Sequence, residues 1–301
     1  MNKRVISIIV GALAGLIIGL FLIITQAVLI FVFPEKSVAV KQGMFIVVLL
    51  LASVAVLIIF GILVINVMRE MKFITLYNDE LHAHGIYSEK ILKEINKRKD
   101  RYKKDRFNSV YLQSVTFLAN YAAVNDDFEG EAKILNDLDV NELNSKLRIE
   151  SGKAKQNDLF NFVNLLSLKL ALCFLEDDEK TAEFLKPFLY KVEELYFDKN
   201  EILKLTILEA KINYFATVKN IELLEDTIAK VPQFKNVNEI AEIVYIASKI
   251  KKDYVTGELT LEVLQNYINE GKEKAENHKN KVYSLQTIEV FERQLKAKAG
   301  I

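Results

Sequence analysis

The chain has 301 residues, and its 40 Lys and Arg balance 40 Asp and Glu, so the formal net charge is zero. Apolar residues make up 51% of the chain and its mean hydropathy is +0.14. This composition excludes disorder as the main state, because there is ample apolar surface to bury. One cysteine, 11 glycines and three prolines exclude a disulfide-stapled scaffold and a collagen-like chain.

The first 68 residues contain two long apolar runs in which no residue is charged. They cover residues 5–33 and 42–68. Each run exceeds the ~20 residues that an α-helix needs to cross ~30 Å of hydrocarbon. A cleaved signal peptide has a shorter apolar region than either run. We therefore predict that residues 1–68 form a transmembrane helical hairpin in the lipid bilayer.

The distribution of basic residues predicts the orientation of this hairpin. The short loop 34–41 contains only Lys36 and Lys41, whereas Lys3, Arg4 and many residues after position 68 are basic on the other side. Lys and Arg are enriched on the cytoplasmic side of membrane spans. We expect a multi-pass protein of the cell (inner or plasma) membrane, with cytoplasmic N- and C-termini.

Glycines recur every four residues on one face of the first span, at Gly11, Gly15 and Gly19. Small residues at this spacing let a second membrane helix approach closely. We predict that this face packs against the second span. A homo-oligomer contact through the first span is the alternative.

Residues 69–106 are predicted to form a basic juxtamembrane connector helix. Apolar residues continue at helical spacing from Met71 to Leu81, and Gly85 is expected to break the helix. Residues 86–106 contain nine Lys and Arg against four Asp and Glu. Basic side chains close to the cytoplasmic leaflet attract anionic lipid. A solvated helix that projects away from lipid is the alternative. The candidates for lipid contact are Lys97, Arg98, Lys99, Arg101, Lys103, Lys104 and Arg106.

Residues 107–301 show the apolar spacing of amphipathic helices and no run typical of a strand. Polar corners, rich in Asp and Asn that favour helix N-caps, are expected to separate the helices. Residues 159–175 are apolar nearly all round and are predicted to form a central buried helix. Pro187 is expected to kink or split the helix over 181–197. The corners lie at 125–127, 176–179, 219–220 and 252–253.

This cytoplasmic domain, residues 107–301, resembles the tetratricopeptide-type (TPR-like) helical repeats. The resemblance rests on Leu118-Ala119-Asn120-Tyr121, on Asp126-Asp127-Phe128 and on Ala132, with similar pieces around Ala171 and Ala210. It implies an all-α chain whose hairpins stack into an α-solenoid with a concave peptide-binding face. An irregular helical bundle without a groove is the alternative.

Chemistry-bearing motifs are missing from the sequence. It contains no phosphate-binding Gly-rich loop and no nucleophile elbow, and it has only three histidines. We expect no catalytic residues, no cofactor and no metal site. With 25 basic and 32 acidic residues, positions 107–301 carry a net charge of −7, which disfavours nucleic acid.

Together these features predict a non-enzymatic, membrane-anchored adaptor or scaffold whose cytoplasmic helical-repeat domain binds an unidentified protein partner. The alternative is an obligate subunit of a multi-protein membrane complex, such as a transport or secretion assembly. In that case the hairpin would pack against other membrane subunits.

Overall fold

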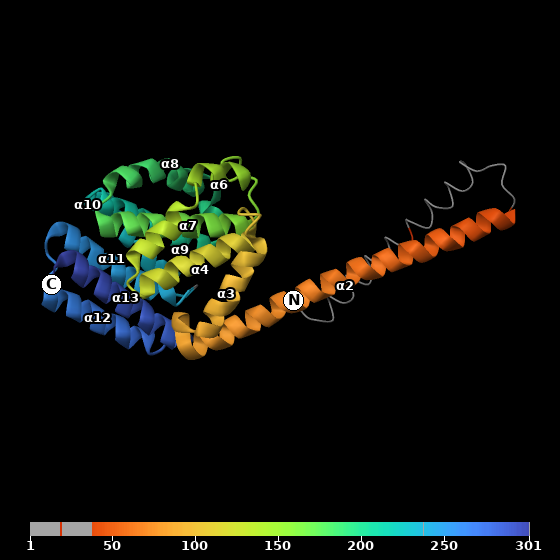
Figure 1. The fold of residues 1–301 in the computed structure, drawn as a ribbon. Helices are drawn as coiled ribbons and strands as arrows, with labels where there is room; N and C mark the ends of the chain where they lie inside the picture. The colour runs from red at the N-terminus through yellow and green to blue at the C-terminus, as the bar shows by residue number, and fades with distance from the viewer. Residues whose placement is uncertain (1–18, 20–37, 237, 301) are drawn as a thin grey trace. The chain divides into compact units, whose positions relative to one another are not determined.

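The computed structural model describes residues 19, 38–236 and 238–300. Within this part of the chain all regular structure is helical and no strand is present (Figure 1). The all-α prediction is therefore confirmed, and the arrangement is compatible with a helical-repeat fold. The chain divides into two compact units, Met1–Thr75 and Leu76–Ile301. The predicted first span, with Gly11 and Gly15, lies outside the described residues, whereas Gly19 is described and helical.

Helix α2 extends without interruption over Val38–His84. Large apolar side chains are exposed along it on successive positions, so it lacks the single apolar stripe of a helix that packs on a soluble core. From Val54 onward it is long and apolar enough to cross a membrane. The exposed side chains include Ile58, Ile59, Phe60, Ile62, Leu63, Val64, Ile65, Val67 and Met68.

A second helix meets the same length and composition test but has a different environment. It is α7, over Gln156–Glu176, and more than half of its apolar window is buried inside the protein. Phe162, Val163 and Leu170 are almost completely inaccessible. This agrees with the prediction of a central buried helix over residues 159–175.

The predicted break at Gly85 is confirmed. Helix α2 ends at His84, and Gly85 begins a 3₁₀ turn, η1 (Gly85–Tyr87), with a φ of +64°. Glycine adopts this left-handed conformation without a steric penalty. Helix α3 (Glu89–Tyr102) follows, and the Ser88 hydroxyl caps it by accepting a hydrogen bond from the Ile91 N–H at 3.4 Å. Helix α3 contacts helix α4 (Ser109–Val124), so it belongs to the second unit.

Several of the remaining helices are joined in pairs by short polar corners. Side chains of Asp127, Asp178 and Asn220 cap the helices that follow them, as the sequence predicts. The helices are α4 (Ser109–Val124), α5 (Phe128–Asn136), α6 (Val140–Lys146), α7, α8 (Glu179–Tyr196), α9 (Glu201–Thr217), α10 (Ile221–Ile228), α11 (Ile240–Thr256), α12 (Leu261–Ala275) and α13 (Lys281–Ala299), with 3₁₀ turns η2 (Phe197–Lys199) and η3 (Val231–Phe234).

One local prediction is wrong, and the two outcomes expected at Pro187 are reduced to one. The corner expected at 252–253 does not exist, because Asp253 is buried inside α11 and accepts a hydrogen bond from the Tyr267 hydroxyl at 2.9 Å. Helix α11 ends instead before Gly257, at a φ of +77°. Pro187 does not split the helix, because α8 continues through it over Glu179–Tyr196. Leu185 and Leu189 on either side of Pro187 are fully buried.

The helices of the second unit form an inner and an outer layer. Helices α4, α7, α9, α11 and α13 each contact the next one in this order, and α13 also contacts α4 and η1. Outer helices α5, α8, α10 and α12 each cover the junction between two successive inner helices. Because the last inner helix meets the first, the inner layer closes into a ring.

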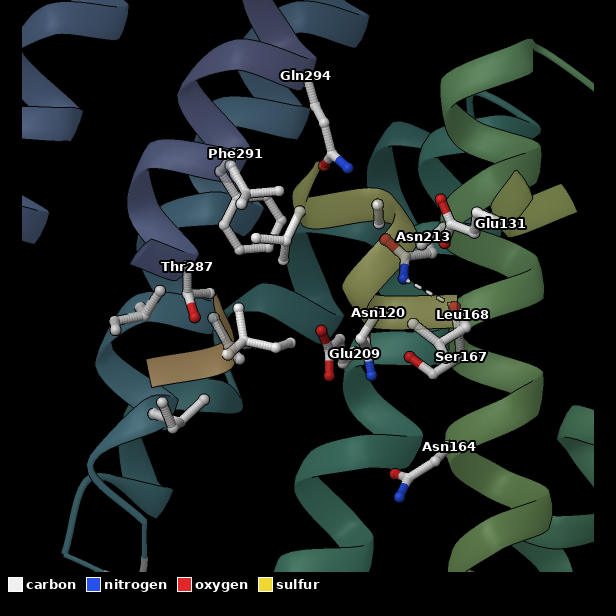
Figure 2. Close-up of a pocket in the computed structure, with 18 of the residues that line it drawn as sticks. Asn120, Glu131, Asn164, Ser167, Leu168, Glu209, Asn213, Thr287, Phe291 and Gln294 are labelled. Atoms are coloured by element: carbon white, nitrogen blue, oxygen red, sulfur yellow. Dashed lines mark hydrogen bonds between the residues drawn. The ribbon is translucent and has the colours of Figure 1, made fainter. Parts of the chain in front are cut away.

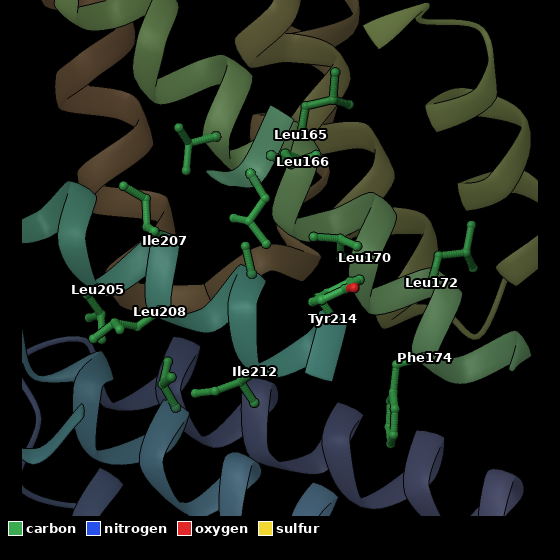
Figure 3. Packing of buried hydrophobic residues seen from close by; sticks show 14 of the residues in the cluster. Leu165, Leu166, Leu170, Leu172, Phe174, Leu205, Ile207, Leu208, Ile212 and Tyr214 are labelled. Atoms are coloured by element: carbon green, nitrogen blue, oxygen red, sulfur yellow. The ribbon is translucent and has the colours of Figure 1, made fainter. Parts of the chain in front are cut away.

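The α7–α9 pair forms the centre of the hydrophobic core. Figure 3 shows Leu166 and Leu170 of α7 beside Ile207, Leu208 and Ile212 of α9. Each is at most 1% exposed. Burial of a Leu or Ile side chain contributes about 1.5–3 kcal/mol, so this contact stabilises the wall around which the ring is built.

Candidate functional site

The ring of inner helices surrounds a cavity of about 340 Å³. Every inner helix contributes to its lining, together with α5 and η1. The volume lies at the lower end of the range for small-molecule pockets. Its walls contain many polar side chains. Four are amides, Asn120, Asn164, Asn213 and Gln294, and several are labelled in Figure 2.

Glu131 contributes a carboxyl group to this cavity from the first turn of α5. Its side chain is 97% buried, since the residue is only 3% exposed. Among the buried side-chain nitrogen and oxygen atoms of the described residues, Glu131 Oε2 alone has no hydrogen-bond partner. Burial, together with the negative charge of Glu176, raises the pKa of Glu131 to about 7. The group therefore changes charge near neutral pH.

Lys251 of α11 contributes a buried ammonium group. Its Nζ donates a hydrogen bond to Asn213 Oδ1 at 2.5 Å, and lies 5.6 Å and 5.4 Å from the ring centroids of Phe174 and Phe291. Burial lowers the pKa of Lys251 to about 8, and the negative charge of Glu209 opposes that shift. The ammonium is thus held by one amide and two aromatic faces.

Glu209 of α9 is the second carboxyl group in the lining. Burial raises its pKa, and the positive charge of Lys251 opposes that shift. The pKa of Tyr283 is raised by burial and then by Glu209. The lining therefore contains two carboxyl groups and one amine, an excess of one acidic group.

The seam that closes the ring joins α13 to the ends of earlier elements. Arg293 Nη2 donates to the Val124 carbonyl at 2.7 Å, and Arg293 Nε forms an ion pair with Asp126 at 3.0 Å. Lys298 Nζ reaches the Leu175 carbonyl at 3.2 Å and Asp177 at 2.8 Å. These contacts satisfy carbonyl groups at the C-terminal ends of α4 and α7, which helices otherwise leave without partners.

The basic residues predicted to contact lipid lie on α3 and just after it, away from the cavity lining. They differ in accessibility. Arg98 is only 3% exposed, Lys99 is half-buried, and Arg106 forms an ion pair with Asp137. The exposed ones are Lys97, Arg101, Lys103 and Lys104.

The residues that line the cavity were not predicted as a site. A signal was present in the sequence, since Asn213 and Lys251 occur among apolar residues of helices α9 and α11. It could not show that these residues face one space. In the described part of the chain no group of three His, Cys, Asp or Glu could hold a metal ion.

Comparisons with known proteins give no family for this chain. No protein-family model matches it, and neither the curated proteins nor the solved structures contain a match.

Proposed function

We propose that the protein is a membrane-anchored, non-enzymatic adaptor. Residues 1–68 form a transmembrane hairpin in the cell membrane, both termini are cytoplasmic, and the TPR-like helical domain binds another protein. The observation that carries this proposal is the contrast between the two long apolar helices. Helix α7 buries its apolar side chains in the protein, whereas the apolar part of α2 exposes them.

Lipid is the solvent that such a helix requires. In water, contiguous exposed apolar side chains such as Ile62, Leu63 and Ile65 would drive aggregation. All backbone hydrogen bonds of a helix are internal, so α2 needs no further partner in a bilayer. Of the basic residues after the span, the exposed ones, Lys97, Arg101, Lys103 and Lys104, are those we propose to contact anionic lipid.

The layered helical domain supports an adaptor role but changes where the partner binds. A 340 Å³ cavity accommodates a small molecule and not a folded segment of another protein. The partner therefore contacts the outer layer of helices. The net charge of −7 over residues 107–301 favours a partner that presents basic residues.

Crosslinking in native membranes, followed by mass spectrometry of the purified full chain, tests this proposal. We expect one protein to be captured reproducibly through lysines of the second unit, with lower yield at high ionic strength. Capture of no protein above the level of a control membrane protein with the same tag would contradict the adaptor role.

Replacement of residues 1–68 by an unrelated two-span hairpin separates the adaptor from the subunit alternative. An adaptor needs only its location, so the same protein should still be captured. If capture is lost while the helical domain remains folded, the hairpin itself contacts other membrane subunits, and the protein is an obligate subunit of a larger complex.

A further inference from the structure

The cavity contains an acceptor that the protein itself does not satisfy. Glu131 Oε2 is buried and receives no hydrogen bond from any described residue, although amide and hydroxyl side chains line the same space. Leaving a buried charged acceptor without a donor costs more free energy than a hydrogen bond returns. A buried polar atom without a partner needs an explanation, and a ligand that supplies the missing donor is one.

Lys251 does not supply that donor. Its ammonium is committed to Asn213 Oδ1 and to the faces of Phe174 and Phe291. Within the described residues, no ion pair joins Lys251 to Glu131 or to Glu209. The cavity thus contains a second carboxyl group, and its net charge is negative when all three groups are ionised.

We propose that this cavity binds a small organic amine, whose ammonium group donates hydrogen bonds to Glu131. A primary ammonium carries one positive charge and three N–H donors, which matches the missing donor and neutralises the excess carboxylate. Leu168, Ile243 and Phe291 provide apolar wall for the carbon skeleton. A divalent metal ion fits less well, because Lys251 shares the cavity and no group of three metal-ligating side chains exists in the described chain.

The test uses the full chain in detergent at about pH 8, which lies above the pKa of about 7 that burial gives to Glu131. Unfolding is followed by the labelling of Cys173, the only cysteine, with a thiol-reactive fluorophore. The probes are n-butylamine, tetramethylammonium, which has the same charge and no N–H, and butyrate, which has the opposite charge. A ligand that binds only the folded state raises the unfolding temperature in a saturable manner.

We expect n-butylamine to raise the unfolding temperature in a saturable manner, and tetramethylammonium and butyrate to leave it unchanged. Glu131→Gln should weaken n-butylamine binding at least about tenfold, since a charged hydrogen bond is lost. Glu129→Gln, an exposed position on the same helix, is the matched control and should bind like the wild type. Ala171→Leu should abolish binding by filling the cavity without changing a carboxyl group.

If n-butylamine and tetramethylammonium raise the unfolding temperature equally, the positive charge alone is responsible and no N–H donor is required. This result would overturn the proposal. So would unchanged n-butylamine affinity in Glu131→Gln. Because this variant replaces an unpartnered buried charge by a neutral amide of the same shape, it should fold at least as stably as the wild type. Isothermal titration of n-butylamine provides the affinity independently of unfolding. None of these outcomes depends on the protein partner.

Discussion

The side chain of Gln286 on α13 forms two hydrogen bonds with the turn at Gly85, although Gln286 and Ile86 are 200 residues apart. Its Oε1 accepts a hydrogen bond from the Ile86 N–H at 2.8 Å, and its Nε2 donates to the His84 carbonyl at 2.9 Å. Gly85 lies between these two groups, and a Cβ there would overlap the Gln286 amide. The last inner helix thus holds the end of α2 and the start of the helical ring together.

The first prediction concerns Gly85→Ala. The alanine must adopt a φ of +64° and displace the Gln286 side chain, so we expect a loss of about 2–4 kcal/mol in the free energy of unfolding. Gly257→Ala is the control, because Gly257 has a φ of +77° but no atom near its Cβ position, and it should lose only about 1 kcal/mol. The free energy of unfolding is measured by thermal unfolding in detergent. Equal losses in the two variants would mean that the Gln286 hydrogen bonds do not stabilise the turn.

The second prediction concerns Arg293, which closes the ring from α13. Arg293→Ala removes charged hydrogen bonds to the Val124 carbonyl and to Asp126 and should cost about 2–3 kcal/mol. Lys281→Ala removes only an exposed ion pair with Glu276 and should cost less than about 1 kcal/mol. Hydrogen exchange should also increase at the ends of α4 and α13 in Arg293→Ala alone. Unchanged exchange there would contradict closure through this residue.

The third prediction concerns pH. The pKa of Glu131 is raised from 4.5 to about 7 by folding, so the folded state holds a proton that the unfolded state releases between these values. Protonated Glu131 therefore stabilises the folded state fully below pH 4.5. This contribution decreases as the pH rises from 4.5 to about 7, and it is lost above pH 7. A shift of this size corresponds to about 3 kcal/mol. Glu131→Gln should lack this decrease and be more stable than the wild type at pH 8, while exposed Glu129→Gln should retain it. If the free energy of unfolding changes with pH in the same way in the wild type and in Glu131→Gln, the raised pKa does not belong to Glu131.

The fourth prediction concerns Cys173. Its thiol is 4% exposed, and burial raises its pKa to about 12. Because the thiolate is the reactive form, the folded protein should react very slowly with maleimide at neutral pH and stoichiometrically after unfolding. Cys173→Ala should not react in either state, which controls for background labelling. Rapid stoichiometric reaction of the folded protein would show that α7 is not buried.

Much of the fold could be predicted from the sequence because the signals are local. The break at Gly85, the caps at Asp127, Asp178 and Asn220, and the burial of α7 each depend on residues within one or two helical turns. Asp253 shows where local signals fail. A Lys-Asp pair resembles a corner, but its Asp bonds to Tyr267 of the next helix and stays inside α11.

The cavity could not be predicted for a different reason. Its polar residues come from six helices, and Glu131 and Lys251 are 120 positions apart. Nothing in a single sequence indicates that α13 returns to α4 and closes the ring, because Gln286 and Arg293 make their contacts across the whole domain. The closed ring converts the expected concave groove into an internal space.

Alkaline carbonate extraction of native membranes tests the membrane anchor most directly. High pH releases peripheral proteins, whereas a helix such as α2, with its large apolar side chains exposed over residues 54–68, should keep the full chain in the pellet until detergent is added. Recovery of the intact chain in the detergent-free supernatant would show that lipid is not the solvent of α2 and would contradict the proposed anchor.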